Sequence, residues 1–215
     1  MAVAFGNFAT KVQTTNDVIW AITPAANSSV MVIQGSCSGQ VINQVDLDGN
    51  VSLKLNQIIN SKWNQYYNPG SQVTPGVSQT VRVQAGGTDA STWAAITFTG
   101  TPSDSTVIVT TASTTDDASP ASVTISGADE GNMVVDGISV EGGTETSTIA
   151  GDQTAIFDDV GSGNIQSASY EAAPVGGGDV TVSYTFASTT SRLGALELLA
   201  AAAEAAAFIP RMMIY

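Results

Sequence analysis

The chain has 215 residues, of which 43% are hydrophobic and only 12% are charged. Its 19 acidic and 6 basic residues give a formal net charge of −13, and it contains no histidine and one cysteine, Cys37. Without histidine, Ser-His-Asp and Cys-His catalytic systems and histidine metal sites are excluded. One thiol builds neither a disulfide framework nor a cysteine-rich zinc site. Six scattered cations argue against binding to a nucleic-acid backbone.

The sequence shows no pattern that directs the chain into or across a membrane. The first cation, Lys11, follows apolar residues instead of preceding them, which is not the order of a secretory signal peptide. The most apolar stretch, residues 193–209, contains Glu197 and Glu204. It therefore falls short of the ~20 apolar residues that span a bilayer. We expect neither a leader peptide nor a membrane partner.

Short apolar or alternating segments, bounded by turn-forming residues, recur along the chain and predict strands. Residues 41–55 give the clearest pattern, because Asp48-Gly49-Asn50 separates two alternating segments and predicts a β-hairpin. The other predicted strands are residues 30–34, 80–84, 94–98, 106–110, 121–126, 132–140, 154–157, 166–172 and 179–186. Strands at this spacing predict an all-β protein, an antiparallel β-sandwich or a barrel.

Two segments depart from the strand pattern. Residues 56–68 place Ile59, Trp63 and Tyr66 or Tyr67 at spacings of three and four, which predicts a short amphipathic helix, with a strand and loop as the alternative. Residues 200–208 are almost entirely alanine, which favours a helix. Pro210 would then end that helix.

The sequence contains no exact repeat, and it predicts one β-sandwich domain over residues 1–199 followed by an extension over residues 200–215. The extension ends in a mostly apolar segment: Phe208, Ile209, Pro210, Arg211, Met212, Met213, Ile214 and Tyr215. Left in water, such a segment promotes aggregation and proteolysis. We therefore predict that it is an assembly arm that docks on a neighbouring subunit, with docking on its own sandwich as the alternative.

Three aromatic residues, Trp63, Tyr66 and Tyr67, are interleaved with amide side chains. Aromatic faces beside amides are suited to binding neutral polar ligands, so these residues form a possible ligand platform. The alternative is that they belong to the core, because large aromatic side chains are mostly buried. The sequence favours the core.

Two acidic patterns could bind calcium. The motif from Asp46 to Asn50 resembles the start of a calcium loop, but Val51 and Gln57 stand where such a loop needs Gly and Glu. A hairpin turn is therefore favoured. Three pairs of adjacent acids could contribute to calcium binding or to a glycosidase site: Asp116-Asp117, Asp129-Glu130 and Asp158-Asp159. Adjacent residues of a strand point to opposite faces, so turn acids are favoured. We expect no catalytic residues, no metal and no cofactor.

Four segments carry a resemblance to a known family: residues 121–125, residues 131–140, residues 150–154 and a closing strand over residues 192–199, with weaker agreement at residues 3–5. Together they resemble the Gly/Ser/Thr-rich β-sandwich proteins, jelly-roll or concanavalin-like, of phage virions and bacterial exteriors. The resemblance covers about residues 120–200. Its motifs are structural, so it implies a fold and a location but no catalytic residues.

The sequence and this resemblance predict a virion structural protein, a capsid decoration or cement protein of a tailed phage that bridges neighbouring shell subunits. Its expected location is the particle exterior, or otherwise extracellular. The expected partners are the major capsid protein or other virion subunits, and further copies in a homo-oligomer. The alternatives are a carbohydrate- or surface-binding adhesin module of a phage tail or cell exterior, and an extracellular filament subunit. We do not expect an enzyme.

Overall fold

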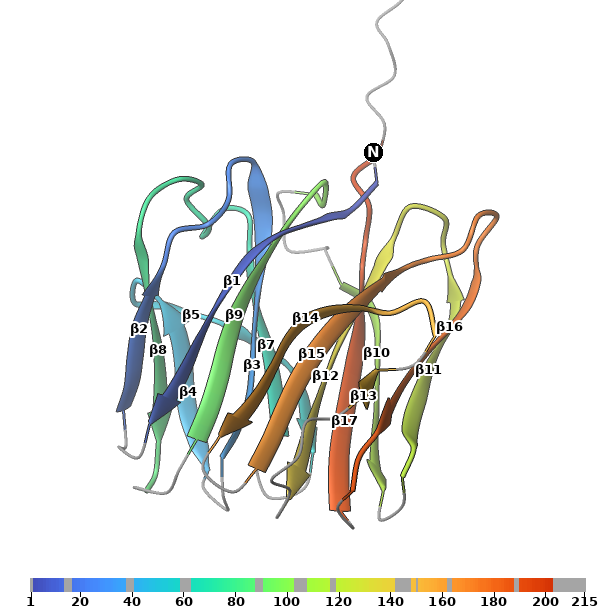
Figure 1. Ribbon diagram of the computed structural model, residues 1–215. Helices are drawn as coiled ribbons and strands as arrows, with labels where there is room; N and C mark the ends of the chain where they lie inside the picture. The colour runs from blue at the N-terminus through green and yellow to red at the C-terminus, as the bar shows by residue number, and fades with distance from the viewer. Residues whose placement is uncertain are drawn as a thin grey trace, which may run out of the picture.

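The computed structural model describes residues 2–13, 17–37, 41–58, 63–87, 91–102, 108–116, 119–141, 148–149, 151–161, 164–187 and 190–202. Over these residues the chain forms strands and no helix (Figure 1). No helix long and apolar enough to cross a membrane occurs in this described part. The strands of the first half are β1 (Ala4–Gln13), β2 (Asp17–Ile22), β3 (Ser28–Cys37), β4 (Ile42–Leu47), β5 (Asn50–Val51), β6 (Leu53–Ile58), β7 (Trp63–Pro69), β8 (Gln79–Ala85) and β9 (Ser91–Thr99). Those of the second half are β10 (Ile108–Asp116), β11 (Ala121–Ala128), β12 (Met133–Glu141), β13 (Thr148–Ile149), β14 (Thr154–Gly161), β15 (Asn164–Ala172), β16 (Gly178–Thr185) and β17 (Thr190–Leu198).

The strands form four sheets that stack as four layers (Figure 1). The first sandwich, β1–β9, has an outer sheet in the order β2-β8-β4-β5 and an inner sheet in the order β1-β9-β3-β7-β6. The second sandwich, β10–β17, has an inner sheet in the order β10-β17-β12-β15-β14 and an outer sheet in the order β11-β16-β13. The two inner sheets face each other in the middle of the molecule. This arrangement confirms the predicted class, an antiparallel all-β protein of the sandwich type. The single sandwich that the sequence predicts over residues 1–199 is, however, a pair of sandwiches packed against each other.

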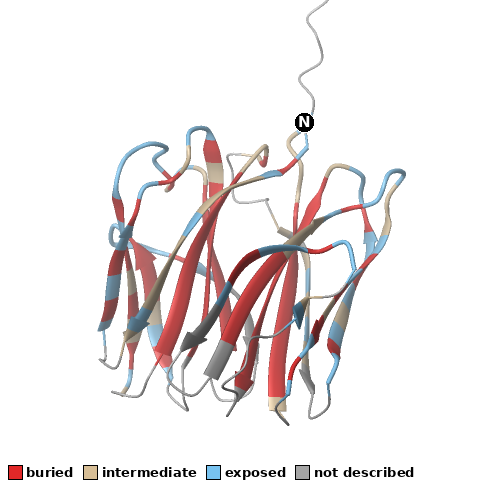
Figure 2. Cartoon of the chain, in the orientation of Figure 1, coloured by how far each residue is buried: buried red, intermediate tan, exposed pale blue. Residues whose placement is uncertain are grey.

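Three hydrophobic cores separate the four layers. One core lies inside the first sandwich, one lies between the two inner sheets, and one lies inside the second sandwich. Strands of the outer sheets alternate between buried and exposed residues, as β2 does. Strands of the inner sheets are covered on both faces, so β9 and β17 are buried almost throughout (Figure 2).

The two sandwiches have the same strand connectivity. In each inner sheet the first strand of the sandwich in chain order pairs with the last, as β1 with β9 and β10 with β17. In each outer sheet the second strand of the sandwich pairs with the second-to-last, as β2 with β8 and β11 with β16. The registers agree as well: Val32 of β3 pairs with Tyr67 of β7, and Val135 of β12 pairs with Tyr170 of β15. The chain is therefore a tandem structural duplication, even though its sequence contains no exact repeat.

The turn that precedes the third strand is built in the same way in both sandwiches. The backbone N–H of Ser28 donates to the carbonyl three residues earlier at 3.1 Å, and that of Asn132 does the same at 3.0 Å. Asn27 and Gly131 just before them have φ of 64° and 89°. Only Gly and, less readily, Asn adopt this left-handed conformation without a large steric cost.

An approximate two-fold axis parallel to the strands relates the sandwiches. Across the central core, β6 lies against β10, β7 against β17 and β3 against β12. Phe8 of β1 stacks on Phe157 of β14 at a ring distance of 5.8 Å. The two inner sheets thus face each other with their strand orders reversed, and the equivalent strands β3 and β12 lie opposite each other. Asn27 and Ala201 line one hollow, and the N–H of Ala200 donates to Asn132. The equivalent strands β3 and β12 therefore start at the same end of the molecule.

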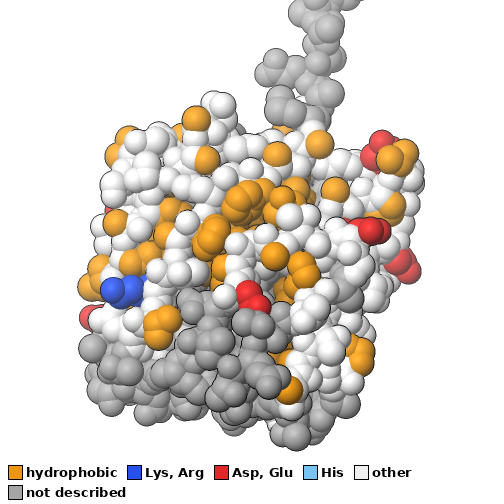
Figure 3. Space-filling model, in the orientation of Figure 1, with side chains coloured by type: hydrophobic (Ala, Val, Ile, Leu, Met, Phe, Trp, Pro, Cys, Tyr) orange, Lys and Arg blue, Asp and Glu red, His pale blue; other side chains and the backbone are white. Residues whose placement is uncertain are grey.

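Aromatic side chains close the joint between the sandwiches along the edge that β1 forms with β14 and β15. Phe5 stacks on Tyr170 with ring centroids 5.4 Å apart, and it also meets Phe98 edge-on at 6.1 Å. Phe8 is 41% exposed, and Figure 3 shows hydrophobic side chains gathered in the middle of this face. These rings bury apolar area from both sandwiches and so stabilise the joint.

Trp63 of the first sandwich packs against the backbone of the opposite inner sheet. Its side chain is fully buried and lies across Gly137 of β12 and Gly194 of β17, which are paired with each other. A Cβ atom would be 2.6 Å from the indole ring at Gly137 and 2.7 Å from it at Gly194. Any larger residue at either position would therefore require the indole ring or the opposing backbone to shift.

Amide side chains beside Trp63 connect the two sandwiches. Gln65 donates through Nε2 to Oε1 of Gln34 at 2.9 Å, and Nε2 of Gln34 donates to the carbonyl of Asp136 in the second sandwich at 3.1 Å. Both glutamines are fully buried. Their hydrogen bonds offset the cost of removing amides from water.

The helix predicted over residues 56–68 is wrong. Residues 53–58 belong to β6 and residues 63–69 to β7, and residues 59–62 lie outside the described part. Every residue of β7 is buried, because its strand lies between two sheets. Asn64 and Gln65 are interior residues and do not form the solvated face of a helix. The spacing of the aromatic residues was therefore misleading.

The predicted C-terminal extension lies mostly outside the described part. The last strand ends at Leu198, and the N–H of Ala201 donates to the carbonyl of Gly100 at 2.7 Å. Residues 203–215, with the predicted arm and most of the predicted alanine helix, are not described. The division into residues 1–199 and 200–215 stays a prediction.

We predict that Gly137→Ala destabilises the protein by about 1–3 kcal/mol, because its Cβ atom overfills the contact with Trp63. The free energy of urea-induced unfolding measures this. Gly86→Ala is the matched control, because its nearest neighbour would lie at an ordinary 3.5 Å. In a Trp63→Ala background the cost of Gly137→Ala should shrink. Equal effects of the two glycine substitutions would contradict the role of this contact.

Candidate functional site

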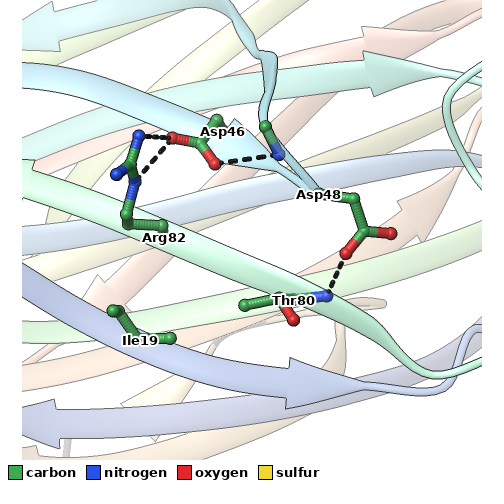
Figure 4. A pocket seen from close by; sticks show the side chains of 6 residues that line it. Ile19, Asp46, Asp48, Thr80 and Arg82 are labelled. Atoms are coloured by element: carbon green, nitrogen blue, oxygen red, sulfur yellow. Dashed lines mark hydrogen bonds and ion pairs between the residues drawn. The ribbon is translucent and has the colours of Figure 1, made fainter.

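An open hollow of about 420 Å³ lies on the outer face of the first sandwich. Figure 4 shows its lining, which comes from β2, β8 and the hairpin that β4 and β5 form. The lining residues are Ile19, Asp46, Asp48, Gly49, Thr80 and Arg82. The hollow thus combines two acids, one cation and an exposed apolar side chain.

Asp46 is held by Arg82 and by the turn that follows it. Nε and Nη2 of Arg82 both lie 2.8 Å from Oδ2 of Asp46, and the N–H of Gly49 donates to Oδ1 at 3.2 Å. Gln44 donates to Oδ2 at 3.1 Å. The carboxylate is 5% exposed, so its charge is neutralised largely within the protein.

Asp48 and Gly49 form the hairpin turn that the sequence predicts. Their φ angles are 50° and 82°, and left-handed residues at both central positions match the twist of a hairpin. Oδ1 of Asp48 accepts from the N–H of Thr80 at 2.7 Å, and Oδ2 accepts from Nε2 of Gln79 at 3.0 Å. The turn lies where the sequence predicts it, but the hairpin is shorter than predicted, because only Asn50 and Val51 pair back with β4. Residues 53–58 form β6, which pairs with β7 in the inner sheet.

This arrangement does not suit a cation. All four oxygens of the two carboxylates accept hydrogen bonds from N–H groups, whereas a calcium ion needs them as ligands. Among the described residues, no group of three or more Cys, Asp or Glu side chains is placed to hold a metal ion. Of the acids predicted to lie in turns, Glu130 does so and accepts from the N–H of Gly176 at 3.1 Å. Asp158 lies in β14 instead, where it accepts from Ser167. These acids stabilise loops and strands.

A second polar cluster is buried in the centre of the second sandwich. Asp136 of β12 is fully buried and accepts hydrogen bonds from the hydroxyls of Tyr184 on β16 and Ser169 on β15. Gln153 donates to Oγ of Ser169 at 2.7 Å and accepts from the N–H of Ser183 at 2.8 Å. The cluster thus ties the inner sheet of the second sandwich to its outer sheet.

Burial raises the pKa of Asp136 from 3.8 to about 6, because the charged carboxylate is removed from water. The hydroxyls of Tyr184 and Ser169 act in the opposite direction, since they donate to the charged form. The pKa of Tyr184 is raised well above its usual value by burial and by the adjacent carboxylate. These two groups form no nucleophile–base pair, and their burial separates them from any substrate in solvent.

The predicted ligand platform is in the core. Trp63, Tyr66 and Tyr67 are 0%, 5% and 6% exposed. Trp63 and Tyr67 face the second sandwich, whereas Tyr66 faces the outer sheet and lies 6.5 Å from the ring of Trp93. A stacking platform needs an exposed ring face, so this burial favours the core alternative.

Neither the Asp136 cluster nor the pairing of Asp46 with Arg82 was predicted from the sequence. The sequence does mark Asp136, because it is a single acid at an inward position of the apolar run in residues 132–140. Its partners Ser169 and Tyr184 are distant in sequence, so no local pattern links them to Asp136. Arg82 likewise reaches Asp46 only through the pairing of β4 with β8.

Neither a scan against models of protein families nor searches of curated proteins and of solved structures found a match to this chain. The resemblance to phage and bacterial β-sandwich proteins therefore stays a prediction.

We predict that Asp136 makes the protein less stable as the pH rises. The folded state holds this proton more tightly than the unfolded state, because the pKa is about 6 in one and about 3.8 in the other. The stabilisation from the protonated Asp136 carboxyl is full below about pH 4 and is lost as the pH rises through 6, which lowers the free energy of unfolding by about 3 kcal/mol. In the Asp136→Asn variant this pH-dependent change in the free energy of unfolding should disappear. Urea unfolding at pH 4.5 and pH 8 tests this, with the exposed Asp152→Asn as control. The same pH dependence in both variants would contradict the assignment.

Proposed function

We propose that the protein is a structural component of a virus particle, a capsid decoration or cement protein of a tailed phage that bridges neighbouring shell subunits. One observation carries this proposal: two sandwiches of identical connectivity are fused face to face into a four-layered body. We infer that each sandwich is a jelly roll, the architecture of many capsid and lectin domains. In the first, the segment from β5 to β6 passes directly from the outer to the inner sheet, as the strands at the corners of a sandwich do.

The use of the charged side chains supports a structural role. Asp46, Asp48 and Asp136 are all occupied by hydrogen bonds that hold strands and turns together. A fold alone does not define a function, so the chemistry of these sites has to support one. They serve rigidity, which a protein that reinforces a shell needs.

The apolar C-terminal segment supplies the means of attachment in this proposal. The last described residues run along the end of the molecule where Ala201 is hydrogen-bonded to Gly100. On a particle surface, many copies that each contribute one weak arm bind strongly through multivalency. The partner is the major capsid protein or another virion subunit. The net charge of −13 keeps decorated particles apart in solution.

The alternative is a carbohydrate- or surface-binding adhesin module, since lectin domains also use jelly rolls. No described feature favours it over the first candidate, because the three aromatic residues of its platform are in the core.

We predict that a variant that ends at Ala202 stays folded but no longer attaches to particles. Every described strand is retained, because the last one ends at Leu198. Thermal unfolding monitored by circular dichroism measures the folding. Attachment is measured by co-expression with the major capsid protein of the phage that encodes the chain, followed by sedimentation of the particles formed.

The full chain is the reference, and Phe208→Ala with Ile214→Ala is a milder variant of the same segment. The full chain should sediment with particles and the truncated chain should stay in the supernatant. If both forms stay in the supernatant, the decoration proposal is wrong. If both sediment, the arm is not the attachment element.

A further inference from the structure

A serine hydroxyl, a carboxamide and a carboxylate meet in the interior of the second sandwich. Oγ of Ser169 donates to the carboxylate of Asp136 at 2.7 Å, and Nε2 of Gln153 donates to the same Oγ at 2.7 Å. The carboxamide carbon is bonded to Nε2 at about 1.33 Å, so it lies within about 4 Å of Oγ. A hydroxyl attacks a carbonyl carbon from about 3–3.5 Å. A small side-chain rotation therefore brings Oγ of Ser169 within reach of the side-chain carbonyl of Gln153.

The backbone of the outer sheet determines the orientation of this carboxamide. Oε1 of Gln153 accepts from the N–H of Ser183 on β16 at 2.8 Å. Because a backbone N–H can only donate, the atom that faces it is the oxygen, and the nitrogen faces Ser169. The same N–H stabilises negative charge that develops on the oxygen. The carboxamide is thus polarised for attack at its carbon.

Asp136 is placed to remove the proton of the Ser169 hydroxyl. A serine hydroxyl is a weak nucleophile until an adjacent base accepts its proton. Burial raises the pKa of Asp136 to about 6, close to the value at which a general base acts best in neutral solution. Tyr184 donates to the same carboxylate, and its hydroxyl lies 3.1 Å from Oγ of Ser169. Tyr184 thereby holds the base against the nucleophile.

The four side chains of this cluster are shielded from water. Asp136, Ser169 and Tyr184 are fully buried, and Gln153 is 8% exposed. A site without water lets a hydroxyl of the chain react in place of a water molecule, and it protects the product from hydrolysis. No substrate has to enter, because nucleophile, base and carboxamide belong to one chain.

The first sandwich shows that the fold does not require these polar groups. Asp136 pairs with Ser169 between the middle strands of the second sandwich. The equivalent pair in the first sandwich is Ile33 with Tyr66, and both residues belong to its hydrophobic core. The stability of the fold alone therefore does not account for a buried carboxylate and hydroxyl at these positions.

We propose that Ser169 and Gln153 form an ester bond with each other in a self-modification that Asp136 catalyses. Oγ of Ser169 attacks the carboxamide carbon while its proton passes to the carboxylate of Asp136. The negative charge then lies on Oε1, to which the N–H of Ser183 donates. When the bond from that carbon to Nε2 breaks, Asp136 returns the proton and the nitrogen leaves as ammonia. One C–O bond replaces one C–N bond, no oxidant or reductant is needed, and the carboxylate is regenerated.

The ester adds a covalent link between neighbouring strands. Ser169 pairs with Ala155 near the start of β14, and Gln153 stands just before that strand. The bond therefore closes a loop over residues 153–169, which reduces the freedom of the unfolded chain and stabilises the fold. It forms within one sandwich of one chain, so it does not depend on the proposed function.

Mass spectrometry of the intact, denatured full chain tests the proposal. The ester lowers the mass by one ammonia, about 17 Da, relative to the sequence. Ser169→Ala lacks the nucleophile and Asp136→Asn lacks the base, so each should keep the full mass of its own sequence. Ser167→Ala is the matched control, because position 167 lies on the same face of β15. It should still lose ammonia. Circular dichroism confirms that each variant is folded.

Digestion of the wild-type chain at acidic residues locates the link. Cleavage after Asp158 or Asp159 separates Gln153 from Ser169, so the two fragments stay joined only through the ester. Mild alkaline hydrolysis should release them and leave a carboxylate at position 153. A wild-type chain with the full sequence mass overturns the proposal, and so does a loss of ammonia that persists in Ser169→Ala. An ester that still forms in folded Asp136→Asn overturns the role of Asp136 as the base.

Discussion

Trp63 lies across two paired glycines at the centre of the contact between the inner sheets, and the architecture depends on that contact. A β-sheet exposes two faces, and each inner sheet covers one face with its own outer sheet. The remaining faces are apolar in both sandwiches and bury each other. Gly137 and Gly194 allow the indole ring to reach the backbone of the opposite sheet. Neither sandwich could leave this face in water without exposing a large apolar surface.

Coverage on both faces also determines where polar groups occur in the interior. Gln34 and Gln65 are acceptable in the central core only because each finds a partner there. The two sandwiches differ on the opposite face of β3 and β12, which points toward the outer sheet of each sandwich. Asp136 of the second sandwich takes the position that Ile33 holds in the first, so one outer core is polar at its centre and the other is apolar. Duplication thus preserved the backbone and left the side chains free to diverge.

Features that depend on neighbouring residues could be predicted from the sequence, whereas features that depend on residues far apart in the chain could not. The hairpin at Asp48 and Gly49 could be predicted because an Asp-Gly turn between alternating segments is a local signal. β7 could not, since both of its faces are buried and amides interrupt the alternation that marks a strand. The same holds for the sites. Asp46 was visible as a turn acid, but its pairing with Arg82 depends on strands 36 residues apart. The duplication is likewise carried by register and connectivity, which leave little trace in residue identity.

The two outer faces differ in chemistry although the strands that form them are connected in the same way. The inner faces are buried within the chain, so the two outer sheets lie at opposite ends of the stack. The hydrogen-bonded threonines at positions 124 and 181 make one end polar and small, whereas Ile19 and Arg82 make the other apolar and charged. The connectivity that the two sandwiches share therefore determines the buried faces and leaves the solvent-facing side chains free to differ.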